Sequence, residues 1–96
     1  MLHIEAQITV KKEQTEAFLQ AAKEVIAASR AEAGNHGYEL VQSTENETVF
    51  YMLEKWADMD AIQQHNDSEH FKKFQKAAAD FVAKELEISV LTPLAR

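Results

Sequence analysis

The segment 48–56, which reads TVFYMLEKW, carries apolar side chains at both alternating sets of positions. Val49, Tyr51 and Leu53 form one set, and Phe50 begins the other. Successive side chains of a strand point to opposite faces, so this pattern predicts a strand that is covered on both sides. The chain has 96 residues, and its own helices can cover only one face of a sheet. We therefore expect a second copy of the chain to cover the other face.

Three further segments have the character of strands. Apolar and polar residues alternate strictly over 2–10 and again over the shorter segment 86–90, and the segment 38–42 is strand-like in composition. These features predict three strands in addition to the one at 48–56. The polar link between 42 and 48 is short, as in an antiparallel hairpin.

Helical spacing appears in the remaining parts of the chain. An apolar stripe from Phe18 to Ser29 predicts a helix, and Gly34 marks the turn after it, where a left-handed backbone is expected. Asp58 is a typical N-cap residue for a short helix that ends near residue 65. Ser68 is a typical N-cap residue for a second helix, which carries a stripe of phenylalanines. The predicted order is β-α-β-β-α-α-β.

This order favours an α+β, ferredoxin-like domain over residues 1–96, with helices on one face of a four-stranded antiparallel sheet. Two copies joined through their sheet faces would form a dimeric α+β barrel. We expect a homodimer for this reason.

Composition excludes several classes of function. The net charge of -6 disfavours binding to nucleic-acid phosphates. The absence of cysteine excludes disulfides, thiolate nucleophiles and iron–sulfur clusters. No apolar run reaches the length of a membrane span, and the N-terminus lacks the pattern of a signal peptide. We expect a cytoplasmic protein that binds neither nucleic acid nor membrane.

Three side chains are candidates for proton transfer. His65 and His70 flank the predicted break between the second and third helices, and histidine is the usual base near neutral pH. Each is also compatible with a capping or surface role. Glu54 lies on the same strand face as Trp56 and otherwise apolar residues, where loss of water would raise its pKa. Pairing with a cation is the alternative for Glu54.

Aromatic residues are candidates for substrate binding. Trp56 is placed to stack on an aromatic substrate or to fill the core, and Tyr51 points to the opposite face of the strand from Glu54. Phe71 and Phe74 belong to a set of phenylalanines that line a pocket or, as the more frequent arrangement, pack as core. The hypothesis of a metal site at the two histidines, which are five residues apart, has less support, because catalytic zinc normally has three protein ligands. We expect no metal and no cofactor.

The segment 54–71 resembles the antibiotic biosynthesis monooxygenase family. It reads EKWADMDAIQQHNDSEHF, an acidic residue and Trp at a strand end followed by two His and a Phe. Residues 28–34, ASRAEAG, and 38–40, YEL, are similar to the family's helix exit and second strand. The resemblance covers nearly the whole chain and implies the fold derived above.

The resemblance also implies a chemistry. Active members oxidise quinols or polyketide anthrones with molecular oxygen and without metal or flavin, and relatives include heme-degrading enzymes and isomerase-like enzymes of autoinducer-2 phosphate. Trp56 matches a Trp of the anthrone type, whereas polar positions of that type fall at Met52 and Ile62. Heme degradation is disfavoured, because the heme-degrading relatives need an Asn, a Trp and an iron-ligating His. At the corresponding positions this chain has Ala6 or Gln7, His65 and Gln75.

The resemblance thus implies a cofactor-independent monooxygenase for a quinol-like or polycyclic aromatic molecule. An isomerase acting on a small phosphorylated or carbonyl compound and a non-catalytic ligand-binding dimer are the alternatives. The expected catalytic residues are His65, His70 and Glu54. Trp56, Tyr51, Phe71 and Phe74 are the expected substrate-binding residues.

Overall fold

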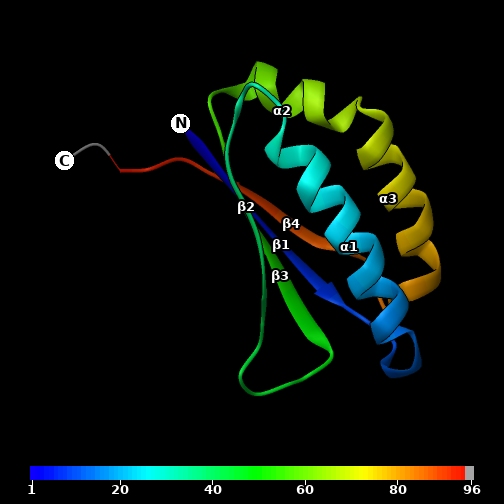
Figure 1. The fold of residues 1–96 in the computed structure, drawn as a ribbon. Helices are drawn as coiled ribbons and strands as arrows, with labels where there is room; N and C mark the ends of the chain where they lie inside the picture. Colours follow the sequence, from blue (N-terminus) through cyan, green and yellow to red (C-terminus); the bar gives the residue numbers. More distant parts are fainter. Residues whose placement is uncertain (95–96) are drawn as a thin grey trace.

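The computed structural model describes residues 1–94, and its elements follow the predicted order β-α-β-β-α-α-β (Figure 1). A short 3-10 helix, Lys12–Gln14, leads into the first α-helix. The expected α+β, ferredoxin-like fold is confirmed. The elements are β1 (Leu2–Thr9), α1 (Thr15–Arg30), β2 (Asn35–Gln42), β3 (Val49–Trp56), α2 (Met59–Asn66), α3 (Glu69–Phe81) and β4 (Glu87–Leu91).

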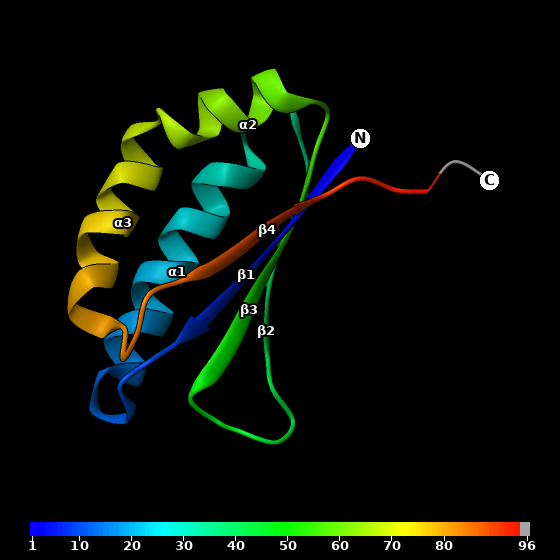
Figure 2. The same ribbon diagram turned by 180° about the vertical axis from the view of Figure 1, so that it is seen from behind.

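The strands form one antiparallel sheet in the order β2-β3-β1-β4. In the register of the two central strands, Ala6 lies opposite Met52 and Ile8 lies opposite Phe50. Alternation therefore places these apolar residues on one face of the sheet. Within residues 1–94, all three α-helices lie on that face, and the opposite face carries no helix (Figures 1 and 2).

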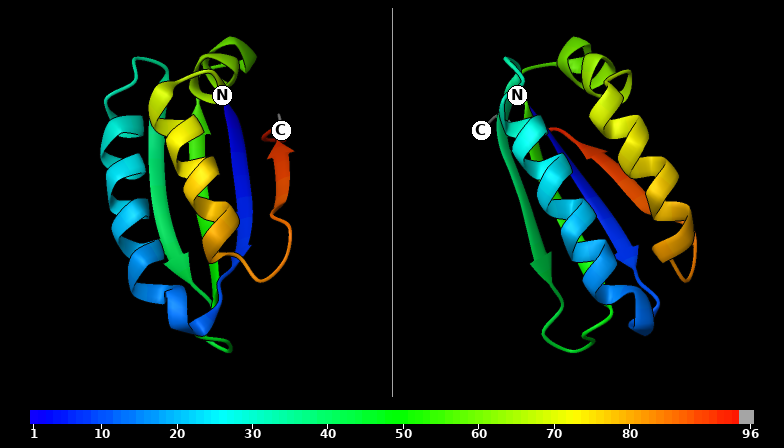
Figure 3. Two further views of the ribbon diagram at one scale, coloured as in Figure 1. Left: turned by 90° about the vertical axis from the view of Figure 1, so that its right-hand side faces the viewer. Right: turned by 45° about the vertical axis from the view of Figure 1, so that its right-hand side comes forward.

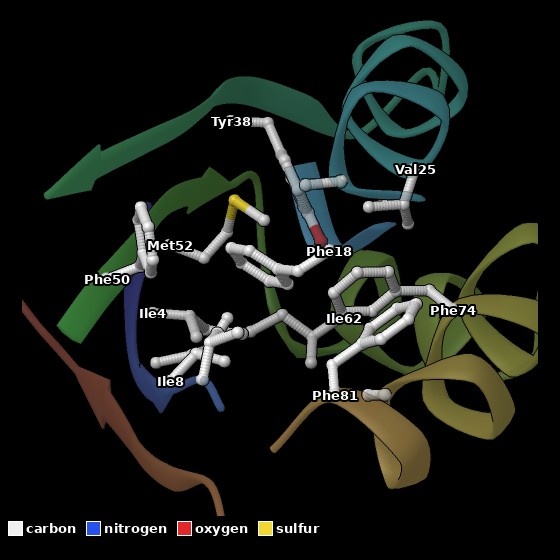
Figure 4. Close-up of a cluster of buried hydrophobic side chains, with 14 of the residues drawn as sticks. Ile4, Ile8, Phe18, Val25, Tyr38, Phe50, Met52, Ile62, Phe74 and Phe81 are labelled. Carbon is white, nitrogen blue, oxygen red and sulfur yellow. The ribbon is translucent and has the colours of Figure 1, made fainter. Parts of the chain in front are cut away.

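The helix-covered face holds the hydrophobic core. Phe18 of α1 lies between the rings of three phenylalanines, with centroid distances of 5.0 Å to Phe50, 6.4 Å to Phe74 and 6.3 Å to Phe81. These rings converge from α1, α3 and β3 in Figure 4. Burial of each ring contributes roughly 1.5–3 kcal/mol to stability. Most of the phenylalanines thus pack as core.

The caps of α2 and α3 form as predicted. The Asp58 carboxylate accepts a hydrogen bond from the backbone N–H of Ala61, and the Ser68 hydroxyl accepts one from the N–H of Phe71. Such caps satisfy amide groups that the helix itself leaves unpaired. They divide the segment after β3 into two helices with a sharp corner between them, seen at the top of Figure 1.

The turn after α1 differs from the prediction. Neither Gly34 nor Gly37 adopts a positive φ, so the expected left-handed backbone is wrong. Gly34 is needed for another reason: a Cβ placed there would lie 2.5 Å from the Cβ of Ala61. The turn and α2 therefore touch through a contact that only a residue without a side chain permits.

Two apolar surfaces of the sheet remain uncovered in this chain. On the face without helices, Val49 and Tyr51 are half-buried and Leu53 is 37% exposed. On the other face, Ile88 and Val90 of the edge strand β4 are more than half exposed, because α3 does not extend over them (Figure 3). None of the helices in residues 1–94 combines the length and apolar character needed to cross a membrane.

Candidate functional site

Three ionisable side chains meet where the helices come together. Glu32 lies just beyond the end of α1, His65 near the end of α2, and His70 in the first turn of α3. The Oε2 atom of Glu32 is 2.7 Å from Nδ1 of His65 and 2.8 Å from Nε2 of His70. Two histidines that lie 33 and 38 positions after Glu32 thus share one of its carboxylate oxygens.

His65 is the most deeply buried of the three, with 1% of its surface exposed. Burial lowers its pKa, while the hydrogen bond and charge of Glu32 act in the opposite direction. Its Nε2 atom has no hydrogen-bond partner. A neutral imidazole with one free ring nitrogen is the expected state near pH 7. Its ring lies 4.6 Å from that of Trp56, 4.7 Å from Phe71 and 5.5 Å from Tyr38, between centroids.

A buried acid, Glu54, lies on the sheet close to these three side chains. Glu54 of β3 is 7% exposed, and its Oε1 atom accepts a hydrogen bond of 2.9 Å from the indole Nε1 of Trp56. Burial raises the pKa of Glu54 to about 7, with a smaller contribution from the charge of Glu32, although the Trp56 hydrogen bond acts against this. Glu54 therefore gains or loses a proton near neutral pH.

Tyr38 of β2 completes the polar group. Burial, followed by the charge of Glu54, raises the pKa of its phenol, which stays protonated at physiological pH. The side chain stands edge-on to Trp56, with 6.2 Å between the ring centroids. A phenol in this state can donate a hydrogen bond but cannot act as a base.

A cavity of about 70 Å³ lies between the sheet and α3. Its polar lining comes from Tyr38, Glu54, His65, Asn66 and Gln75, and apolar side chains of β1, β3 and α3 complete the wall. The volume is enough for a reacting group and far below the roughly 300 Å³ of a small ligand pocket. Ile88 lines the cavity and is 55% exposed, so the cavity reaches the surface beside β4.

A wider groove of about 610 Å³ lies at the end of the sheet, where His3, His36, Lys55 and Pro93 contribute to its lining. It opens broadly to solvent, and most of its lining side chains are exposed or half-buried. Tyr38 and Glu54 line both spaces, whereas His65 lines only the smaller cavity. The smaller cavity is the candidate site because it alone brings the buried imidazole of His65 together with Glu54, and burial shifts the pKa of both groups.

Four of the residues named from the sequence line this cavity, namely His65, Glu54, Phe71 and Phe74. His70 does not line it and instead contacts Glu32 from the solvent side, with its side chain 27% exposed.

The structure brings neither Trp56 nor Tyr51 to the cavity. Trp56 is fully buried, and its indole N–H donates a hydrogen bond to Glu54. Trp56 therefore contacts a residue of the cavity wall without lining the cavity itself. Tyr51 lies on the face without helices, where its hydroxyl accepts a hydrogen bond from the Gln7 side chain.

Sequence reasoning missed Glu32 and Tyr38 as members of the site. Glu32 follows a helix end, a position at which an acidic residue is usually solvated, and its partners lie 33 and 38 residues away. Tyr38 reads as an ordinary apolar position of a strand. The only available signal was their inclusion in the two shorter family-like segments.

The cluster of Glu32, His65 and His70 offers three metal-ligating atoms within 4.8 Å of one another. Two ligands of one tetrahedral zinc ion lie about 3.3 Å apart, given metal–ligand bonds near 2.0 Å. The observed separations of 2.7 and 2.8 Å are shorter and are those of hydrogen bonds. The three side chains are therefore arranged as a hydrogen-bonded cluster.

Comparisons find known proteins with similar sequences and solved structures with similar folds. A curated relative in Bacillus subtilis, named "Putative monooxygenase YcnE", is 38% identical over 88 residues, which cover 92% of this chain and 93% of the relative. A crystal structure from Pseudomonas aeruginosa is 34% identical, with a TM-score of 0.89 and coverage of 98% of this chain and 94% of that chain.

A crystal structure from Bacteroides thetaiotaomicron, titled as a putative antibiotic biosynthesis monooxygenase, is 30% identical. Its TM-score is 0.87, with coverage of 98% of this chain and 90% of that chain. The family model described as antibiotic biosynthesis monooxygenase matches residues 1–77, which include β1 to α2 and most of α3. The chain therefore belongs to the antibiotic biosynthesis monooxygenase family.

Proposed function

We propose that the protein is a cofactor-independent monooxygenase that oxidises a quinol-like or polycyclic aromatic molecule with molecular oxygen. The observation that carries the proposal is the unpartnered Nε2 atom of His65, which is buried beside a cavity with a largely apolar wall. A neutral imidazole in such a place is suited to remove a proton from a bound phenol or from an activated C–H group. The family supports the oxidative outcome.

Proton removal is the step that the protein supplies. The resulting substrate anion gives electrons to O₂. One oxygen atom becomes bonded to a ring carbon, and the other leaves as water. For a quinol, this converts quinol and O₂ into a hydroxyquinone and water. The apolar wall keeps bulk water away from the anion, which preserves its tendency to transfer an electron.

The substrate's reacting edge would occupy the cavity, while the rest of a flat molecule lies over the exposed apolar side chains of β4. Ile88 joins the two regions because it lines the cavity and is half exposed. Phe71 and Phe74 form part of the opposite wall on α3. This cavity, together with the apolar surface of β4 beside it, favours aromatic over charged substrates.

An isomerase is the second candidate, and Glu54 is the observation that favours it. A carboxyl group whose pKa is about 7 shares the cavity with His65. One group can remove a proton while the other returns one, as a 1,2-proton shift requires. This reaction consumes no oxygen.

An oxygen electrode separates these reactions. Quinols and anthrones are tested with the wild-type protein and with His65→Phe, which keeps a buried ring but has no base. His36→Phe, at an exposed position of β2, is the control. We expect wild type and control to consume oxygen and His65→Phe to lose at least about 100-fold in kcat. Uptake equal to background throughout the panel would contradict the monooxygenase, and turnover without uptake would support the isomerase.

We also propose that two copies pair through the sheet faces that carry no helix. Val49, Tyr51 and Leu53 give this face an apolar centre that the chain's own helices do not cover. Light scattering during size-exclusion chromatography is expected to give twice the chain mass of 10.9 kDa. Leu53→Glu should shift the mass toward the monomer, whereas Leu19→Glu, at an equally exposed leucine of α1, should not. A wild-type monomer at micromolar concentration would contradict the pairing.

A further inference from the structure

We infer that Glu32 and His70 are positioning residues that hold His65 in one tautomer, with the proton on Nδ1 and the lone pair on Nε2. The consequence for catalysis rests on the proposed function, but the tautomer itself does not. Neither Glu32 nor its role follows from the sequence alone. The inference is carried by three contacts and by the burial of the ring.

The first step concerns the shared oxygen. A carboxylate oxygen accepts hydrogen bonds and has no proton to donate. The Oε2 atom of Glu32 lies 2.7 Å from Nδ1 of His65 and 2.8 Å from Nε2 of His70. Without a proton on Nδ1, two lone pairs would face each other at hydrogen-bond distance. Both histidines must therefore direct N–H groups at Glu32.

The second step concerns the other ring nitrogen. A neutral imidazole carries one proton, so a proton on Nδ1 leaves Nε2 as an acceptor. Burial lowers the pKa of His65 and disfavours the doubly protonated ring. The Nε2 atom has no protein partner and His65 lines the cavity, so its lone pair is available to a substrate proton. Nδ1 is bonded and Nε2 is free.

The third step concerns what fixes the cluster in place. The backbone of Glu32 is bonded on both sides, since its N–H donates to Ser29 and its carbonyl accepts from Asn35. The carbonyl of His65 accepts hydrogen bonds from both the backbone N–H and the hydroxyl of Ser68. The two side chains therefore meet with little freedom to move apart, and His70 binds the carboxylate from the exposed side.

The tautomer can be measured without any substrate. Long-range ¹H–¹⁵N NMR of the histidine rings, recorded with a chelator present, distinguishes a protonated Nδ1 from a protonated Nε2. We expect wild-type His65 to favour the Nδ1–H form by about tenfold or more, as a hydrogen bond to a charged group would produce. An Nε2–H form in the wild-type protein would overturn the inference, whatever the enzyme does.

Variants test the roles of the neighbours. Glu32→Gln should reduce the tautomer preference at least about fivefold, because a neutral amide is a weaker acceptor and can also donate. His70→Gln should reduce it less. Glu45→Gln, in the exposed β2–β3 hairpin, is the matched control and should leave it unchanged. An unchanged ratio in Glu32→Gln would overturn the role of Glu32, and the wild-type spectrum remains decisive if that variant fails to fold.

Kinetics then connect the tautomer to the proposed function. With a substrate found by the oxygen-electrode screen, Glu32→Gln should lower kcat by roughly 10- to 100-fold, as loss of an orienting partner commonly does. KM should change less than about twofold, because Glu32 does not line the cavity. A large rise in KM with unchanged kcat would contradict a positioning role. A wild-type protein with the predicted tautomer and no turnover would refute the monooxygenase alone.

Discussion

The two ends of the space between sheet and helices are built on opposite principles. At one end, Phe18, Phe50 and Phe81 fill the interior with carbon and leave no polar side chain to satisfy. At the other end, Glu54 and His65 are buried almost as deeply, and His65 retains an unpartnered nitrogen. Strand β3 contributes to both ends, through Phe50 and Glu54.

This difference separates stability from function within one small interior. Burial of an aromatic ring stabilises a fold, whereas burial of a group that could carry charge costs free energy unless it is fully paired. The polar end keeps such groups despite that cost, and it is also where the cavity's polar lining lies. Removal of a buried ring at one end should consequently lower stability, whereas removal of a buried ionisable group at the other should raise it wherever that group is charged.

Phe18→Ala should have the largest effect on stability. Phe18 is fully buried and touches rings from β3 and α3, so its loss leaves a void that backbone elements cannot readily close. We expect the free energy of unfolding to fall by about 3–5 kcal/mol. Urea denaturation followed by circular dichroism measures it. A loss below about 1 kcal/mol would show that the phenylalanine end is not the main source of stability.

Glu54→Gln should change stability in a pH-dependent manner. Folding raises the pKa of Glu54 from 4.5 to about 7, so the folded protein binds this proton more tightly than the unfolded chain does. The associated stabilisation is complete below pH 4.5 and is lost as the pH rises through 7. The glutamine variant has no such loss. Relative to wild type, it should gain roughly 2–3 kcal/mol between pH 5 and pH 8.

The measurement is urea denaturation of both proteins at the two pH values. Taking the difference between variant and wild type removes the contributions of all other titrating groups. Glutamine keeps an oxygen that can accept from the Trp56 indole, so that contact is preserved. A difference that does not change with pH would mean that Glu54 titrates in the folded protein as it does in water.

The phenylalanine end was accessible to sequence reasoning, and the polar end was accessible only in part. Periodicity identifies the buried face of each element, and Phe18 and Phe74 appear in helical stripes. Glu54 was found because a titratable residue on a predicted apolar strand face is unusual, and His65 because a histidine beside a predicted break between helices is a candidate base. These inferences use information within one element, which the sequence carries directly.

The missing members depend on contacts between elements. Glu32 joins the site only because the end of α1 is packed beside the corner of α2 and α3. No pattern of spacing records that proximity. The same limit explains Gly34, for which the sequence predicted a special backbone angle and the structure shows a close approach to Ala61 instead. Packing geometry decided both cases.

Gly34→Ala should have a smaller effect than the two substitutions above, and it tests whether the polar end depends on spacing as well as charge. The new methyl group would lie 2.5 Å from the Cβ of Ala61, so α2 must move away from the turn that carries Glu32. We expect a loss of roughly 1–2 kcal/mol in the free energy of unfolding. Because α2 carries His65, its hydrogen bond to Glu32 should weaken as well.

Gly37→Ala is the matched control, since its Cβ would lie 3.6 Å or more from the nearest atoms, an ordinary contact distance. Urea denaturation and the ring ¹⁵N signals of His65 are compared for both variants. If Gly34→Ala costs stability but leaves the His65 signals unchanged, the turn shifts as a unit with α2. If both change while Gly37→Ala changes neither, the polar end requires this spacing. Equal behaviour of the two variants would mean that the contact at Gly34 does not position the site.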